Sequence, residues 1–152
     1  GLAGGAWLVG ALSGAEGPRQ PRAGVRGERG GEVRRVAFDR VRSLSELDAR
    51  IKASSKPVML DFYADWCVSC KEMERYTFSD VRVQQKLAGW TLLQADVTAN
   101  SEDDKALLAR FRLFGPPGII FFDDRGDEQK AVRVIGFQKV DEFLRNLALI
   151  SP

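Results

Sequence analysis

Two nearly continuous apolar runs are the clearest signals of regular structure in the chain. Residues 58–64, VMLDFYA, hold one aspartate in an otherwise apolar stretch, and residues 90–98, WTLLQADVT, form a second such stretch. Runs of this length without strict alternation are typical of strands that are covered on both faces of a sheet. The sequence therefore predicts two buried strands, with 58–64 as the central one.

Three further strands are predicted around this pair. Residues 33–41 alternate apolar side chains with arginines, and residues 115–124 combine a Pro-Gly turn with an apolar run. The turn residues 125–127 then lead into AVRVIG at 131–136. Such runs bounded by turn residues indicate strands, and the last two strands would form a terminal hairpin.

Helical patterns alternate with these strands. Ser43, with Glu46 three residues later, is typical of a capping box at a helix start. The remaining helices are predicted from Ser101 onward and at 67–76, 80–87 and 140–149, with a break at 77–79. The resulting order, βαβαβαββα, predicts an α/β domain over residues 33–150, with a central mixed sheet flanked by helices on both faces.

The first 32 residues differ in composition from this domain. Residues 1–13 are apolar, rich in glycine and without charge, but they are too short to span a bilayer. They are either the tail of a longer transmembrane helix or a disordered leader. Residues 14–32 are rich in Arg, Gly and Pro, which predicts a flexible linker without packed structure. The arginines of this linker, taken alone, favour a cytoplasmic side.

Overall composition narrows the possible chemistry. The net charge of +2 gives no reason to expect a nucleic-acid partner. The chain has no histidine, so it lacks the commonest general base and the commonest metal ligand. We therefore expect no metal and no bound cofactor, and any chemistry must use thiols, carboxylates or lysines.

The only two cysteines, Cys67 and Cys70, stand three positions apart where a predicted buried strand passes into a helix. A disulfide this short closes too small a loop to add much stability, whereas reversible redox chemistry explains the spacing. Cys67 would be the nucleophile, because unpaired N–H groups at a helix start favour a thiolate. Cys70 would resolve the mixed disulfide. Half of a zinc site and a pair of inert core cysteines are the alternatives.

Two acidic residues are predicted to tune this pair. Asp61 lies inside the apolar central strand, where an unpartnered charge is costly, and Glu74 lies four residues after Cys70 on the same helix face. If both carboxylates are ionised, they oppose a third negative charge on Cys67. The sequence therefore predicts a Cys67 pKa above that of a free thiol, with the two acids also titrating high.

Residues 56–147 resemble the thioredoxin superfamily, and in particular the family of C-terminal periplasmic domains of DsbD thiol:disulfide interchange proteins. The resemblance rests on KPVMLDFYADWCVSCKEMERYTFSD, LLQADVTAN and FGPPGIIFFD. It implies a thioredoxin-like fold in which Pro117 is a cis proline facing the cysteines and shaping partner docking. Trp66 would shield the thiols. The sequence departs from the usual family pattern at Pro116 and Gly118.

The resemblance also implies a place in an electron relay. A transmembrane domain of the same protein would reduce the Cys67–Cys70 disulfide, which would then pass electrons to an N-terminal periplasmic domain. Disulfide isomerases and cytochrome c maturation factors would lie downstream, and the electrons would come from NADPH through cytoplasmic thioredoxin. The implied location is the periplasmic side of a bacterial inner membrane. A free-standing protein-disulfide reductase and a redox-inert binding module remain as alternatives.

Overall fold

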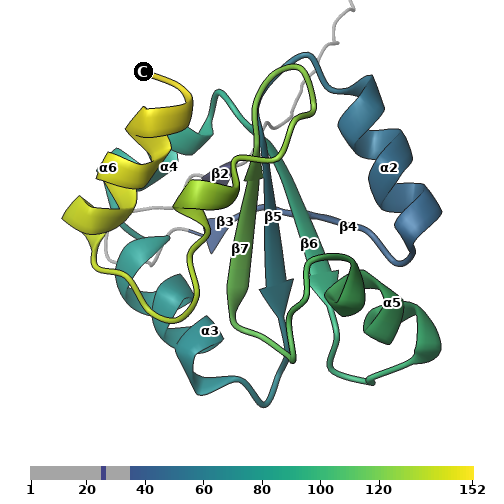
Figure 1. Ribbon diagram of the computed structural model, residues 1–152. Helices are drawn as coiled ribbons and strands as arrows, with labels where there is room; N and C mark the ends of the chain where they lie inside the picture. Colours follow the sequence, from purple (N-terminus) through teal and green to yellow (C-terminus); the bar gives the residue numbers. More distant parts are fainter. Residues whose placement is uncertain (1–24, 27–34) are drawn as a thin grey trace, which may run out of the picture.

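The computed structural model describes residues 25–26 and 35–152, and a four-stranded sheet forms its centre (Figure 1). The strand order is β4 (Asp39–Arg40), β6 (Thr91–Asp96), β5 (Val58–Tyr63) and β7 (Gly118–Phe122). β4 and β5 run parallel to β6, and β7 runs antiparallel to β5. The predicted mixed sheet is thus confirmed, and β5 occupies its interior with a strand on each side.

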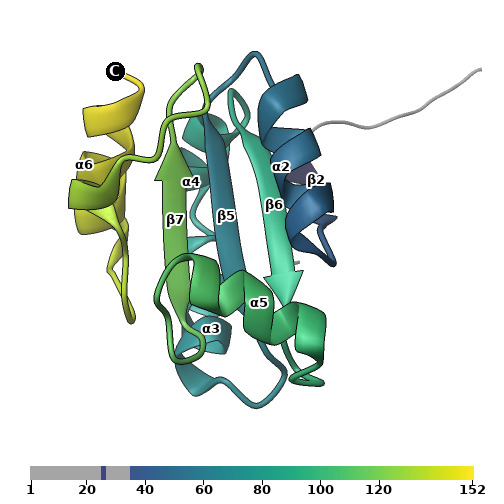
Figure 2. The ribbon, with the colours of Figure 1, turned by 45° about the vertical axis from the view of Figure 1, so that its right-hand side comes forward.

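Helices cover both faces of this sheet, which agrees with the predicted fold class (Figure 2). One face packs against α2 (Leu44–Ala53) and α5 (Glu102–Arg110). The other face packs against η1 (Met73–Thr77), α4 (Val81–Leu87) and α6 (Val140–Ile150). The short helix α3 (Val68–Glu72) lies at the end of the sheet where β5 finishes (Figure 1).

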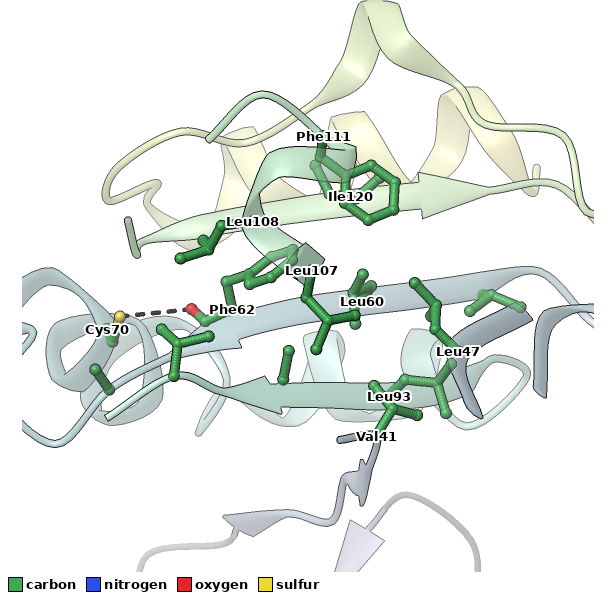
Figure 3. Packing of buried hydrophobic residues seen from close by; sticks show 14 of the residues in the cluster. Val41, Leu47, Leu60, Phe62, Cys70, Leu93, Leu107, Leu108, Phe111 and Ile120 are labelled. Carbon is green, nitrogen blue, oxygen red and sulfur yellow. Dashed lines mark hydrogen bonds between the residues drawn. The ribbon is translucent and has the colours of Figure 1, made fainter. Parts of the chain in front are cut away.

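The two faces bury separate apolar clusters. Figure 3 shows the first, in which Leu60 of β5 and Leu93 of β6 face Leu47 of α2 and Leu107 of α5. These four side chains are at most 1% exposed. Since burying a leucine contributes roughly 1.5–3 kcal/mol, this packing fixes the sheet against its helices.

Helix starts follow the predicted caps with one change. The Ser43 hydroxyl accepts a hydrogen bond from Glu46 N, but the Glu46 carboxylate accepts from Arg42 N rather than completing a box with Ser43. At α5 the reciprocal box is complete between Ser101 and Asp104. Each cap pairs N–H groups that a helix start leaves without partners.

The predicted strand at 131–136 is wrong. Lys130–Val132 form a 3₁₀ turn, η2, and within residues 131–136 only Val134 pairs with β7, through two hydrogen bonds to Ile119. The chain then turns away at Gly136, whose φ of +97° suits glycine. The observed order therefore lacks the second strand of the expected terminal hairpin.

The predicted strand at 33–41 is two short strands instead, β3 (Arg35–Val36) and β4, and only β4 joins the main sheet. β3 pairs antiparallel with β2 (Val25–Arg26), which lies within the segment predicted as an unpaired linker. Residues 1–24 and 27–34, including the predicted leader, lie outside the described residues. Within the described part, no helix has the length and apolar content needed to cross a membrane.

Candidate active site

Cys67 and Cys70 form a disulfide at the first turn of α3. A turn after β5, closed by the hydrogen bond from Cys67 N to Ala64 O, brings the chain to the helix start. Cys67 is the N-cap of α3, and its sulfur accepts a hydrogen bond from Cys70 N at 3.1 Å. A sulfur that caps a helix receives the positive end of the backbone dipoles, which favours its thiolate after reduction.

Both cysteines are nearly buried, at 6% exposure for Cys67 and 5% for Cys70. Exposure therefore does not distinguish the two cysteines. Their surroundings do differ: Cys67 Sγ caps the helix, whereas Cys70 Sγ lies 3.6 Å from the carbonyl oxygen of Phe62 (Figure 3). After reduction, the Cys70 thiol could donate a hydrogen bond to that carbonyl.

Trp66 precedes the disulfide and is 60% exposed. Its indole Nε1 donates a hydrogen bond to the carbonyl of Thr98, whose hydroxyl accepts from Asp65 N. The loop after β6 thus holds the ring beside the disulfide turn. Shielding of the thiols by Trp66 stays a prediction.

The loop before β7 lies at the same end of the sheet as the disulfide. Gly118 pairs with Phe62, whose carbonyl oxygen contacts Cys70 Sγ. The Pro116–Pro117 peptide bond before it is cis. A Cβ on Gly118 would lie 2.9 Å from Leu113 Cδ1, so close packing accounts for glycine here. The role of Pro117 in partner docking stays a prediction.

Asp61 is only 6% exposed, and it is not the unpartnered charge that the sequence suggested. Its Oδ2 accepts a hydrogen bond from Gln94 Nε2 at 3.2 Å, and the two residues are direct neighbours in the β5–β6 register. Burial raises the pKa of Asp61 to about 7; the Gln94 hydrogen bond opposes this rise, and the charge of Glu74 adds to it.

Glu74 and Asp61 approach each other from two elements on the same face of the sheet. Alternation along β5 places Asp61 on the side of Met59, which packs in the second cluster with Met73 of η1. Glu74 follows Met73 in η1. The structure therefore brings together the two acids that the sequence singled out.

The helix that carries Glu74 differs from the continuous α-helix predicted for 67–76. After Glu72 it widens into a π-helical turn, with Phe78 N donating to Met73 O, five residues back, at 2.7 Å. Such turns recur at functional sites, and no sequence signal here predicts one. Burial raises the pKa of the half-buried Glu74, and the charge of Asp65 adds to that, while Lys71 and Arg35 oppose it.

Sequence reasoning missed two polar partners in this site. Gln94 lies in the apolar run of β6, and its place beside Asp61 depends on the register between β5 and β6. Lys71, whose side chain is exposed, donates a hydrogen bond from Nζ to the Tyr63 hydroxyl at 3.1 Å. No grouping of three or more potential metal-binding side chains occurs among residues 25–26 and 35–152.

Comparison with known proteins agrees with this geometry. A thioredoxin-like family model matches residues 41–124. The thiol:disulfide interchange protein DsbD of Ralstonia nicotianae is 55% identical over 96% of the chain, and that of Yersinia enterocolitica 53% identical over 76%. The oxidised C-terminal domain of Neisseria meningitidis DsbD is 36% identical, with a TM-score of 0.62, and the match covers 75% of this chain and 99% of that domain.

The chain belongs to the family of DsbD C-terminal domains. It spans 25% of the Ralstonia relative and 20% of the Yersinia one. A thioredoxin of Thermus thermophilus, 24% identical with a TM-score of 0.58, shares the fold. In this domain Cys67 and Cys70 form a disulfide within a thioredoxin-like fold.

Proposed function

We propose that this domain relays electrons by dithiol-disulfide exchange between a membrane-embedded domain of the same protein and periplasmic partners. The observation that carries the proposal is the disulfide at the N-cap of α3, at the sheet end that it shares with the Pro117 loop. That arrangement combines an activated sulfur with a neighbouring backbone segment, and both are needed for exchange with another protein.

The domain first accepts electrons. A thiolate of the donor attacks Cys67 Sγ, which forms a mixed disulfide and releases Cys70 as a thiolate that takes a proton. The donor's second thiol then loses its proton and attacks the donor sulfur of the mixed disulfide, and Cys67 leaves as a thiolate that takes up a proton. Two electrons and two protons have moved, and the donor is now the disulfide.

The domain then passes these electrons on. The Cys67 thiolate attacks a partner disulfide and releases one partner thiol; Cys70 loses its proton and attacks Cys67 Sγ, which frees the second partner thiol and restores the Cys67–Cys70 disulfide. Helix capping at Cys67 favours this order, since the capped sulfur is the better thiolate. Asp61 and Glu74 adjust how readily that thiolate forms.

The partners follow from the DsbD family rather than from the geometry. The upstream donor would be the transmembrane domain, supplied by cytoplasmic thioredoxin and ultimately NADPH. The recipient would be the N-terminal periplasmic domain, which serves disulfide isomerases and cytochrome c maturation factors. The domain would then lie on the periplasmic side of a bacterial inner membrane, with residues 14–32 as its tether.

Trapping experiments test the assigned roles. The Cys70→Ala variant should accumulate a stable mixed disulfide through Cys67, because no second thiol can resolve it, and turnover should be lost. The Cys67→Ala variant is the matched control. Trapping through Cys70 in that control, without trapping in Cys70→Ala, would reverse the roles.

Two further measurements separate the alternatives. Mass spectrometry after equilibration in glutathione buffers of defined potential should show reversible gain of two hydrogens; a redox-inert module would show none. If the natural gene continues upstream into several apolar helices with their own cysteine pair, the relay stands. A start codon near residue 1 would instead leave a free-standing reductase.

A further inference from the structure

A cavity of about 620 Å³ lies beside the active site, between β3 and the helix that carries the cysteines. Arg35 of β3 and Lys71 of α3 line it together with Glu74 of η1. Its apolar walls include Phe38 and Phe78, whose rings are in contact with centroids 5.8 Å apart. The cavity thus gathers one acid, Glu74, and three cations, Arg35, Lys71 and Arg75, against an apolar wall.

Lys71 is held in place rather than free in solvent. Its Nζ donates a hydrogen bond to the Tyr63 hydroxyl at 3.1 Å and lies 5.6 Å from the centre of the Tyr63 ring. The Tyr63 hydroxyl in turn donates to Asp65 Oδ1 at 3.2 Å. A lysine with two contacts to one aromatic side chain loses much of the freedom that weakens ordinary surface charges.

We propose that Lys71, positioned by Tyr63, and Arg35 are a pair of positioning cations that hold Glu74 as a carboxylate beside the disulfide. This inference rests on the proposed function, because it assigns a role to the surroundings of the same site. Neither cation touches the sulfurs. Both act through Glu74, whose charge is felt by the buried Asp61 and, after reduction, by Cys67.

The charges around Glu74 agree with this arrangement. Lys71 and Arg35 lower the pKa of Glu74, whereas burial and the charge of Asp65 raise it. The hydrogen bond with Tyr63 raises the pKa of Lys71, and the charges of Asp65 and Glu74 add to this rise. Arg75 lines the same cavity, and Asp61 is the remaining acid that interacts with Glu74. The cations therefore offset part of the effect of burial on Glu74.

The direct test is a carbon-13 NMR titration of the Glu74 carboxyl in the oxidised domain. Lys71→Met should raise the Glu74 pKa by a few tenths of a unit, the size expected for an exposed charge pair. Tyr63→Phe should raise it less, because the lysine remains but loses its anchor, and Arg35→Gln should also raise it. Lys52→Met, the same change on α2, should leave it unaltered.

A second readout excludes a merely structural effect. The midpoint of Cys67 alkylation against pH should respond to Lys71→Met differently in the wild-type and Glu74→Gln backgrounds, since the lysine acts through that carboxylate. Equal responses in both backgrounds, or an unchanged Glu74 pKa in Lys71→Met, would overturn the proposal. Wild-type exchange with glutathione is measured in parallel, because its absence would instead contradict the proposed function.

Discussion

The two faces of the sheet are packed alike but carry different chemistry. On the α2–α5 face an apolar cluster surrounds the two sulfurs of the disulfide, and the buried Asp104 of α5 is used in the capping box with Ser101. On the face covered by η1, α4 and α6, an equally apolar cluster surrounds Met59, yet the next residue of β5 to point that way is Asp61. The domain thus buries its disulfide against one face and the strand acid Asp61 in the other.

Because of this difference, the buried acid on one face is expected to lower stability and to affect the reactivity of the thiol. A carboxylate in an apolar layer opposes folding when it is ionised, and a buried leucine in its place would not. Proteins keep such groups where function uses them. The helix that follows the disulfide crosses the sheet end and carries Glu74 toward Asp61. We therefore expect the charges of these two acids to affect the pKa of the thiol on the other face.

The largest expected effect is on stability, and it should be the same on both faces. Leu47→Ala in α2 and Leu147→Ala in α6 remove side chains that are each 0% exposed. Each should lower the free energy of unfolding by about 2–5 kcal/mol. Urea unfolding of the oxidised domain measures this. Neither variant should shift the pH dependence of Cys67 alkylation, and a shift comparable to that of an Asp61 variant would erase the distinction between the faces.

A slightly smaller effect on the free energy of unfolding should depend on pH and arise only on the face that carries Asp61. The pKa of Asp61 is about 7 in the folded domain, against an ordinary 3.8, so the folded state keeps a proton that the unfolded chain releases. Below about pH 4 both states are protonated and nothing is lost. As pH rises from 4 to 7, folding becomes less favourable by up to about 4 kcal/mol.

Asp61→Asn should remove this dependence. The variant should match the wild type near pH 4 and exceed it in unfolding free energy at pH 8, as measured by urea unfolding at both values. Leu147→Ala is the control, since it destabilises the same face without changing the difference between the two pH values. A wild type and Asp61→Asn variant with parallel pH profiles would show that Asp61 is not the group responsible.

The smallest of these effects concerns docking at the sheet end. Pro117→Ala alters the loop that enters β7 opposite Phe62, at the sheet end that it shares with the disulfide, and leaves both sulfurs unchanged. Exchange with a protein partner should slow by roughly tenfold, the equivalent of about 1.4 kcal/mol of lost contact, while reduction by dithiothreitol should change little. Stopped-flow tryptophan fluorescence follows both reactions. Equal slowing of both would contradict a docking role.

The sequence predicted the parts of the fold that depend on local patterns. Apolar runs located β5 and β6, and the Ser43 and Ser101 caps located two helix starts. The prediction of a strand at 131–136 was wrong, because alternation cannot show that the chain turns away from β7 at Gly136, after one bridged residue. Strand-like periodicity is necessary for pairing but does not supply a neighbour.

The site was predictable where chemistry follows from residue type and spacing. The cysteine pair and the two acids could be named, because a CxxC at a helix start and a lone acid in a buried strand are unusual. The hydrogen bond from Gln94 and the anchoring of Lys71 by Tyr63 depend on register and on side-chain direction across the sheet end. Those are tertiary facts, and no local pattern specifies them.

The central claim is that acids on one face of the sheet restrain a thiol packed against the other. The most direct test is the Cys67 pKa in the reduced domain, followed by thiolate absorbance against pH, in the wild type, Asp61→Asn, Glu74→Gln and the double variant. We expect the wild-type value to lie above the ordinary thiol pKa of about 8.5, each single variant to lower it, and the double variant to be lowest. An unchanged or raised Cys67 pKa in both single variants would contradict the account.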